Sequence, residues 1–361
     1  ARWLLDASGR AALVKRRLSL AATNGHQANA VWFRVDRRIE IDDWSTSPAW
    51  RDRCQPQGKR WLSTNHLTGP GYWVWIIPLS SGITSVGIVM DDQAFAEADI
   101  ESEASAMRWL QQHQPRCAEA IAGAGFMDFV VLRDYSYDCK RLYGPENWAI
   151  TGEAGVFTDP FYSPGSDFIA IGNCLLTVLV AAEERGEDIR AQRVLAEKFF
   201  KSVYANTLSL YQGTYGGFGD RTMMALKLLW DYAYYWGVLS LLFFNDVFSD
   251  LRELRDINPL LQKAQRLNAE VQSAFRQRAG QRRVLERRGV FIDQYRIPCL
   301  HRFNEQLTRA DSASTLHELE GNLDMLRVVA AAVRDMLGER PATSVSEAEH
   351  ALLGDYRSLL I

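Results

Sequence analysis

Short runs of apolar and aromatic residues, separated by turn residues, follow one another from residue 29 to residue 139. β-Branched and aromatic side chains at alternate positions predict strands, and the Ser80–Gly82 turn predicts a hairpin between two of them. A helix with Ala106, Trp109 and Leu110 on its apolar face is expected over residues 99–122. The strands are expected over residues 31–35, 39–41, 60–66, 71–79, 83–90 and 128–137. This region therefore predicts a largely antiparallel sheet.

Beyond residue 187 the apolar positions follow the helical period nearly to the end of the chain, with charged residues between them. Breaks are expected at Asn258–Pro259 and Arg340–Pro341, because the residue before a proline is disfavoured in the helical conformation. The pattern predicts an all-helical C-terminal region.

A glycine-rich turn, residues 152–166, joins a short apolar strand at residues 148–151 to an apolar helix at residues 168–182. Gly152 and Gly155 allow backbone to approach a ligand without a Cβ in the way. The following segment leaves N–H groups without partners at the start of the helix, where the helix dipole favours negative charge. The arrangement is typical of a site for a large anionic or polar cofactor.

This turn resembles the second flavin-binding motif of FAD-dependent monooxygenases and, more closely, of flavin-dependent halogenases. Two further stretches agree with it: residues 3–10 resemble the family's strand beside the cofactor, and residues 73–78 match its W-x-W-x-I-P signature. The resemblance extends to about residue 186 and implies that the cofactor is FAD.

A strand followed by G-x-G-x-x-G and a helix, the usual binding unit for the pyrophosphate of FAD, does not precede these motifs. The Gly213–Gly219 segment follows a helical pattern and has the wrong spacing, so a helix–helix connection is the better interpretation. The chain is therefore expected to be the C-terminal part of a longer flavoprotein and to bind FAD poorly by itself.

Together, the patterns and the resemblance predict an α+β fold with a C-terminal all-helical region. Residues 1–20 and 141–186 are expected to form the remnant of an α/β FAD-binding domain. Residues 21–140 are expected to form the antiparallel sheet of a substrate domain, and residues 187–361 the helical region.

The resemblance also assigns individual cofactor contacts. Pro160 is expected to lie against the flavin ring, and Gly165 and Ser166 to offer N–H groups to its pyrimidine edge. Glu153 stands where the family usually has an aspartate that contacts the ribityl chain. An ordinary strand-to-helix turn, which also favours Gly, Asp and Ser, is the alternative. The cofactor-binding residues assigned in this way are Asp6, Gly152, Glu153, Asp159, Pro160, Gly165 and Ser166.

Trp73 and Trp75 alternate along one expected strand and therefore point to the same face. The resemblance makes these two residues and Pro78 a wall of the substrate pocket, and a pair of core tryptophans is the alternative. Neither indole is an acid or base at neutral pH. The catalytic lysine that the resemblance implies lies outside this chain, so no catalytic residue is assigned.

Residues Ser163, Pro164 and Gly165 correspond to the loop that binds halide through backbone N–H groups in the halogenases. Position 164 commonly carries Ser or Thr there, whereas Pro164 has no N–H to donate. A halide that loses one charge-assisted hydrogen bond loses about 1.5–3 kcal/mol of binding free energy. The substitution predicts an impaired halide site.

Composition limits the cofactors and partners. The net charge of −3 gives no general attraction to nucleic acid, and six dispersed histidines show no metal-ligand spacing. Five scattered cysteines without a C-x-x-C motif indicate reduced thiols and a cytoplasmic protein.

Two further segments have a structural and a functional interpretation. The aromatic run at residues 228–248 predicts a core helix that also lines a large apolar substrate site, and peripheral membrane contact is less favoured. A cluster of arginines predicts a solvated helix face, with docking of an acidic carrier protein as the alternative. The cluster comprises Arg276, Arg278, Arg282, Arg283, Arg287 and Arg288.

The resemblance implies an FAD-dependent oxidoreductase in which reduced flavin and O2 oxidise an aromatic or conjugated substrate, free or tethered to a carrier. Electrons are expected from NAD(P)H through a separate flavin reductase. The tryptophan signature favours halogenation, whereas Pro164 favours hydroxylation or dehydrogenation. A non-catalytic binding module that retains the fold is the third possibility.

Overall fold

The computed structural model describes residues 1–54, 56–281, 293–307, 315–338 and 347–354. The chain divides into two compact units. The sheet unit comprises Gln27–Tyr135 and Tyr215–Gly219, and the helical unit comprises Ala1–His26, Ser136–Thr214 and Asp220–Ile361. The expected three-part domain division stays a prediction, while the expected combination of an α+β fold with a helical C-terminal region is confirmed.

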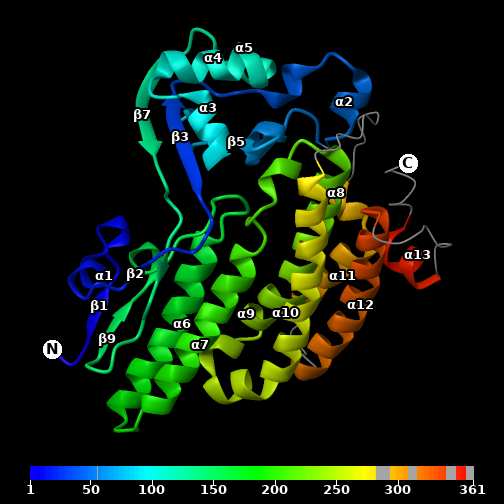
Figure 1. The fold of residues 1–361 in the computed structure, drawn as a ribbon. Coiled ribbons are helices and arrows are strands. Elements are labelled where there is room, and N and C mark those ends of the chain that lie inside the picture. Colours follow the sequence, from blue (N-terminus) through cyan, green and yellow to red (C-terminus); the bar gives the residue numbers. More distant parts are fainter. Residues whose placement is uncertain (55, 282–292, 308–314, 339–346, 355–361) are drawn as a thin grey trace. The chain divides into compact units, whose positions relative to one another are not determined.

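A five-stranded sheet with the order β4-β5-β6-β3-β7 forms the centre of the sheet unit, and all its neighbouring strands are antiparallel. Strands β3, β5 and β7 of this sheet are labelled in Figure 1. Its strands are β3 (Ala28–Val35), β4 (Asn65–Gly69), β5 (Tyr72–Pro78), β6 (Thr84–Asp91) and β7 (Phe126–Leu132). The hairpin at Ser80–Gly82 is confirmed, since the Leu79 N–H donates to the Ile83 carbonyl at 2.8 Å.

Alternate residues of these strands, among them Phe33, Val74, Ile76 and Ile88, are buried in one core with Trp109 and Leu110. The helices of the sheet unit are α2 (Pro48–Asp52), α3 (Asp92–Ala98), α4 (Glu103–His113) and α5 (Pro115–Ile121). Helices α3, α4 and α5 supply the residues that cover this face of the sheet.

One expected strand is absent, another begins later than expected, and the expected single helix is divided. Residues 41–44 form a 3-10 turn in place of a strand, although Ile39 and Ile41 are both buried in the core. The strand expected over residues 60–66 begins only at Asn65, as β4. Residues 60–62 form a 3-10 turn, because Asp42 accepts hydrogen bonds from the Arg60 backbone N–H and guanidinium. The expected helix over residues 99–122 is interrupted before Pro115, whose fixed φ and missing N–H begin a new helix.

The helical unit contains two small sheets. Strands β1 (Leu4–Asp6) and β9 (Trp148–Ile150) pair in parallel, and β2 (Ala21–Ala22) pairs antiparallel with β8 (Asp138–Cys139). Its helices are α1 (Leu13–Arg17), α6 (Gly165–Glu184), α7 (Arg190–Leu208), α8 (Arg221–Tyr234), α9 (Leu241–Phe244), α10 (Leu251–Gly280), α11 (Pro298–Gln306), α12 (Thr315–Met336) and α13 (Glu347–Leu353).

Helix α6 is the one helix in the described part of the chain that is long and apolar enough to cross a membrane. Its residues Phe168, Ile171, Leu175 and Leu179 are buried in the core of the helical unit. The core helix of a soluble protein can be equally long and apolar, so the length and composition of α6 by themselves do not indicate a membrane span.

The expected break at Asn258–Pro259 is wrong, because α10 runs through Pro259 without ending. Its apolar face, which includes Leu254, Ile257 and Leu261, is buried on both sides of the proline. This packing offsets the backbone hydrogen bond that proline removes. The other expected break, Arg340–Pro341, lies outside the described residues.

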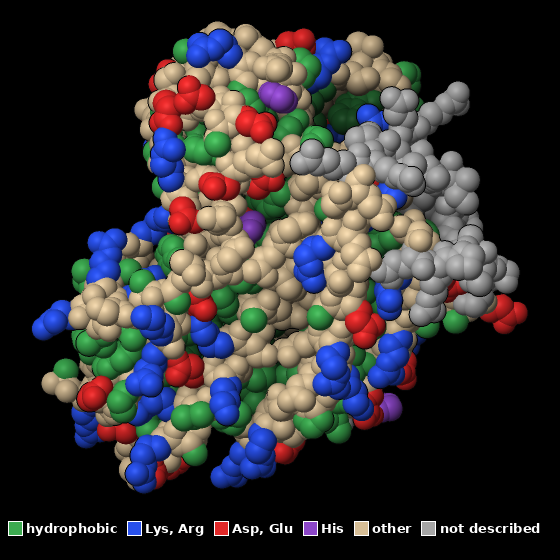
Figure 2. Space-filling model, viewed as in Figure 1, with side chains coloured by type: hydrophobic (Ala, Val, Ile, Leu, Met, Phe, Trp, Pro, Cys, Tyr) green, Lys and Arg blue, Asp and Glu red, His purple; other side chains and the backbone are tan. Residues whose placement is uncertain are grey.

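Two arginine side chains of α10 are bonded within the protein and do not form the expected solvated face. Arg278 pairs with Asp220 at 2.8 Å, and only 13 % of its side chain is exposed. Arg276 donates to the Ser209 carbonyl at 3.4 Å. The remaining members of the cluster, at positions 282, 283, 287 and 288, lie outside the described residues. On the face shown in Figure 2, basic and acidic side chains are interspersed.

The aromatic run is built into the helical unit. Trp230 and Tyr234 of α8 are buried, and a π-helical turn at Tyr235–Ser240 continues the helix. Phe248 at the end of the run is also buried, whereas Phe244 is 65 % exposed. The run therefore fills core positions, as expected, and it also lines the cavity described below.

Candidate functional site

The glycine-rich turn begins where the pairing of β1 with β9 ends. The Thr151 N–H donates to the Asp6 carbonyl at 3.0 Å, and Gly152 then takes φ = +61°. The Gly152 carbonyl accepts from the Gly155 N–H at 2.9 Å, which closes the turn. From the helix after β1, Lys15 Nζ donates to the Gly155 carbonyl at 3.0 Å. The turn is thus held from both sides by backbone and side-chain donors.

Asp6 is buried, and its carboxylate is occupied by its own loop. Oδ1 accepts from the Ser8 N–H at 3.0 Å, and Oδ2 accepts from the Val14 N–H at 2.6 Å. Burial works against the charged form of Asp6, but the Ser8 side chain, the Val14 and Ser8 N–H groups and the charge of Lys15 outweigh it and lower the pKa of the carboxyl group. The side chain therefore shapes the turn after β1, and a direct cofactor contact stays a prediction.

Asp159 is almost completely buried and pairs with His26, a residue that the sequence patterns did not single out. Its Oδ2 lies 2.8 Å from His26 Nε2, and its Oδ1 accepts from the Phe161 N–H at 3.0 Å. The carboxylate thus fixes the backbone immediately after Pro160, so the structure gives it a role in shaping the loop.

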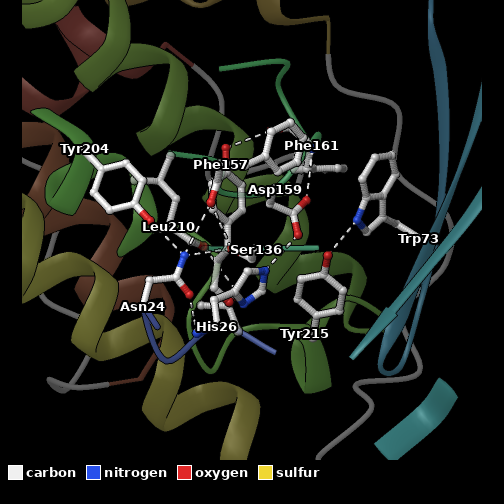
Figure 3. Close-up of polar contacts among 12 residues, drawn as sticks. Asn24, His26, Trp73, Ser136, Phe157, Asp159, Phe161, Tyr204, Leu210 and Tyr215 are labelled. Atoms are coloured by element: carbon white, nitrogen blue, oxygen red, sulfur yellow. Dashed lines mark hydrogen bonds and ion pairs between the residues drawn. The ribbon is translucent and has the colours of Figure 1, made fainter. Parts of the chain in front are cut away.

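A partly buried polar network continues from His26 (Figure 3). The side-chain carbonyl oxygen of Asn24 accepts from the His26 N–H at 3.0 Å. Asn24 Nδ2 donates to Ser136 Oγ and to Tyr204 Oη, both at 2.8 Å. These residues are far apart in the sequence and have no shared motif, so only the folded chain reveals them.

The loop before α6 has unusual backbone geometry. Tyr162 and Ser163 both take left-handed conformations, with φ of 69° and 57°. The Ser163 N–H already donates to the Pro160 carbonyl at 2.9 Å, and Pro164 caps the helix without an N–H of its own. The N–H groups of Gly165, Ser166 and Asp167 lie in the first turn of α6, where helix geometry provides no acceptor. An added Cβ at Gly165 would meet nothing within 4 Å.

The other predicted site residues lie on this turn and in the sheet unit. Glu153 is half-buried, and its carbonyl accepts from Tyr137 Oη at 2.6 Å. In the sheet unit, the rings of Trp73 and Trp75 lie on the same face of β5, with centroids 5.7 Å apart. Their face is opposite the one that packs on α3–α5, because Val74 and Ile76 point into that core.

Both indoles have partners within the sheet unit. Trp73 is buried and donates to Tyr215 Oη at 2.9 Å (Figure 3), and Trp75 donates to Ser85 Oγ at 3.1 Å. The Trp75 ring covers Gly87, where an added Cβ would come within 2.1 Å of the indole. Pro78 ends the same strand. The role of these residues as a substrate-pocket wall stays a prediction.

A cavity of about 170 Å³ lies within the helical unit and includes Tyr162 and Pro164 in its wall. Tyr162 Oη donates to Asp231 Oδ2 at 3.0 Å, and the same oxygen pairs with Lys227 Nζ at 2.9 Å. Lys227 is completely buried, which lowers its pKa, while Asp231 counteracts this shift. No sequence motif marked this pair, although Lys and Asp four residues apart share a helix face.

Among the described residues, no group of three or more His, Cys, Asp or Glu side chains is arranged to hold a metal ion.

Gly152→Ala is expected to lower the free energy of unfolding by about 1–2 kcal/mol, because φ = +61° is unfavourable for an L-residue. The new Cβ would also lie 3.1 Å from Ile169 Cγ1. Urea denaturation measures the change. Gly321→Ala in α12 is the matched control, since its Cβ meets nothing within 4 Å. That variant is expected to gain up to about 1 kcal/mol. Equal stabilities for the two variants would contradict the strain argument.

His26→Leu is expected to lower the free energy of unfolding by about 1–3 kcal/mol, because Asp159 loses a buried hydrogen-bond partner. His26→Gln keeps a donor and is expected to restore part of the loss. The exposed His301 provides a control, since His301→Leu should change stability by less than about 0.5 kcal/mol. Thermal and urea denaturation give the comparison, and wild-type stability of His26→Leu would refute it.

No protein-family model matches the chain. Among curated proteins, it is 27 % identical over 180 residues to flavin-dependent halogenase chlA of Dictyostelium discoideum, covering 49 % of this chain and 30 % of chlA. It is 29 % identical over 198 residues to flavin-dependent halogenase armH2 of Armillaria mellea, covering 51 % and 36 %. A 1H-pyrrole-2-carbonyl-[peptidyl-carrier protein] chlorinase of Pseudomonas fluorescens is 28 % identical over 166 residues, covering 46 % and 35 %.

Among solved structures, halogenase PltM in complex with phloroglucinol and FAD matches with a TM-score of 0.58 and 16 % identity. The match covers 93 % of this chain and 64 % of PltM. The chain therefore has a halogenase-like fold. It is related to the flavin-dependent halogenase superfamily, as its sequence motifs predicted. The matched region spans about a third of the length of the curated relatives.

Proposed function

We propose that this chain is part of an FAD-dependent oxidoreductase that uses reduced flavin and O2 on an aromatic or conjugated substrate. The observation that carries the proposal is the turn at Gly152 followed by the open N-terminus of α6, in a chain whose curated relatives are flavin-dependent halogenases.

The residues present fit a flavin. Gly165 has open space around its α-carbon, and the N–H groups of Gly165, Ser166 and Asp167 form a donor set at the positive end of the helix dipole. Such donors suit the electron-rich pyrimidine edge of a reduced flavin. Glu153 and Pro160 would lie beside them on the same turn. The chemistry with O2 would come from bound FAD. The chain's own residues would hold the flavin and shape the pocket.

Exposed leucines support the view that the β1–β9 pair belongs to a larger FAD-binding sheet. Leu4 and Leu5 of β1 are 59 % and 50 % exposed, and Leu13 nearby is 65 % exposed. Two-stranded parallel pairs are rare as independent sheets, because parallel strands are normally buried on both faces. We therefore expect the 361-residue chain alone to bind FAD weakly and to lack activity.

Pro164 favours oxygen transfer or dehydrogenation over halogenation. The Ser163 N–H is engaged with the Pro160 carbonyl, so two successive positions of the halide loop offer no donor. Halogenation remains the second candidate, because Trp73, Trp75 and Pro78 keep the halogenase signature on β5. A non-catalytic binding module is the third candidate.

The proposal includes a flavin reductase as electron source and a cytoplasmic location, in keeping with five cysteines that form no disulfide. The substrate is a small molecule, free or tethered to a carrier. The carrier is included because one curated relative is a chlorinase of a carrier-bound pyrrole.

The test is to incubate the natural polypeptide that contains this chain with reduced FAD, O2, halide and a panel of aromatic substrates, and to read the product masses. A mass gain of one oxygen, or a loss of two hydrogens, supports the proposal. A halogenated product supports the second candidate, and unchanged substrates support the third. In parallel, FAD titration of the 361-residue chain alone is expected to give weak binding, and a stoichiometric yellow complex would overturn that expectation.

A further inference from the structure

The cavity in the helical unit has an aromatic wall. Tyr162, Tyr211, Tyr232, Tyr234 and Tyr235 all line it, together with Asp167 and apolar residues of α7, the π-helical turn, α9 and α10. Its volume of about 170 Å³ is close to that of an internal cavity that holds one benzene ring. A ligand in this space is therefore limited to one ring or a compact alkyl group.

The cavity wall carries two carboxylates and, among the described residues, no lysine or arginine. Asp231 is already balanced, since it pairs with Lys227 and accepts from Gln272 Nε2 at 2.8 Å and from Tyr162 Oη at 3.0 Å. Its charge and its hydrogen-bonding capacity are both largely used inside the protein.

Asp167 is different. Its Oδ1 accepts from Tyr235 Oη at 3.1 Å, and in the described part of the chain no cation lies within ion-pair distance of its carboxylate. Burial raises the pKa of Asp167, and the Tyr235 hydroxyl partly counteracts this shift. A carboxylate that is partly removed from water and has no counter-ion is costly, and a cationic ligand would remove that cost.

The surrounding tyrosines experience the same negative field. Burial first, and then the charge of Asp167, raise the pKa of Tyr235 to about 12. Burial, together with the charges of Asp159, Asp231 and Asp167, also raises the pKa of Tyr211. The faces of aromatic rings attract cations, so the carboxylate and the rings favour the same type of ligand.

We propose that this cavity binds a small organic ammonium ion, a protonated amine on a single ring or compact alkyl group, with its N–H groups on the Asp167 carboxylate and its charge against the tyrosine rings. Because Tyr162 and Pro164 of the loop before α6 also line the cavity, an amine of this kind on an aromatic ring is the substrate of the oxidoreductase, and this part rests on the proposed function. The negative charge of Asp167 would repel an anionic aromatic compound, so the cavity would not bind one.

The test measures binding to the 361-residue chain by isothermal titration calorimetry, without flavin, using three compounds of similar shape: benzylamine, benzyl alcohol and benzoate. Benzylamine is expected to bind at least about tenfold more tightly than benzyl alcohol, and benzoate is expected not to bind. Equal or tighter binding of the neutral alcohol would overturn the proposal, since size alone would then explain recognition.

Asp167→Asn is expected to weaken benzylamine binding about tenfold and to change benzyl alcohol binding by less than about twofold. Tyr235→Phe removes the hydroxyl bonded to Asp167 and is expected to keep or strengthen benzylamine binding, which separates loss of charge from loss of fold. Asp188→Asn, at an exposed pair with Arg190, is the matched control and should bind like the wild type. Unchanged benzylamine affinity in Asp167→Asn would refute the assignment.

The ammonium site and the proposed function can be refuted independently of each other. If benzylamine binds as expected but the complete polypeptide oxidises no aromatic substrate of the panel, the ammonium site stands and the proposed function falls. If neutral phenols are oxidised while benzylamine does not bind, the oxidoreductase stands and the ammonium site falls.

Discussion

Lys227→Met is expected to lower the free energy of unfolding by about 3–5 kcal/mol, because it leaves the Asp231 carboxylate buried without its counter-ion. Lys227 is fully buried, and Gln272 Oε1 accepts a second hydrogen bond from its Nζ at 3.0 Å. Methionine keeps much of the volume but none of the donors. Guanidinium denaturation of wild type and variant, fitted with a common slope, measures the difference.

A second variant separates charge from packing. In Lys227→Met combined with Asp231→Asn, the pair becomes neutral, while the new side-chain amide on α8 still offers polar partners to Tyr162 and Gln272. This double variant is expected to recover most of the lost stability. Arg116→Ala, from an exposed pair with Glu119, is the control and should cost less than about 1 kcal/mol. A loss below about 1 kcal/mol for Lys227→Met alone would contradict the argument.

Pro164→Thr is expected to tighten chloride binding about tenfold in the natural polypeptide loaded with FAD, because it adds an N–H donor to the loop before α6. The backbone at position 164, with φ = −69° and ψ = −9°, is one that threonine adopts without strain. Chloride titration of the flavin absorbance measures affinity, and product mass shows whether chlorination increases relative to oxygen transfer.

The control for this prediction is Pro298→Thr, which changes the proline at the first residue of α11. Chloride affinity should stay at the wild-type value in that variant. Efficient chlorination by the wild type at ordinary chloride concentrations would show that the missing N–H does not disable the loop, and the preference for oxygenation would fall.

The antiparallel sheet and the turn at Gly152 could be predicted from local patterns, because strand alternation and a glycine at positive φ leave clear signals in the sequence. The errors fall where local signals conflict with packing. Pro259 predicts a helix end, but the buried face of α10 continues through it. Residues 39–41 alternate like a strand, yet they contribute isoleucines to the core without pairing.

The candidate site shows the same division. Residue types at fixed spacing were enough to indicate the superfamily, the location of the flavin-type turn and the missing donor at Pro164. Three features emerge only from the folded chain: the pairing of Asp159 with His26, the hydrogen bond from Tyr162 to Asp231, and the place of Asp167 in an aromatic cavity where no described residue is its counter-ion. These partners lie up to 133 residues apart, and their contacts depend on how helices and loops pack together, which no local spacing encodes.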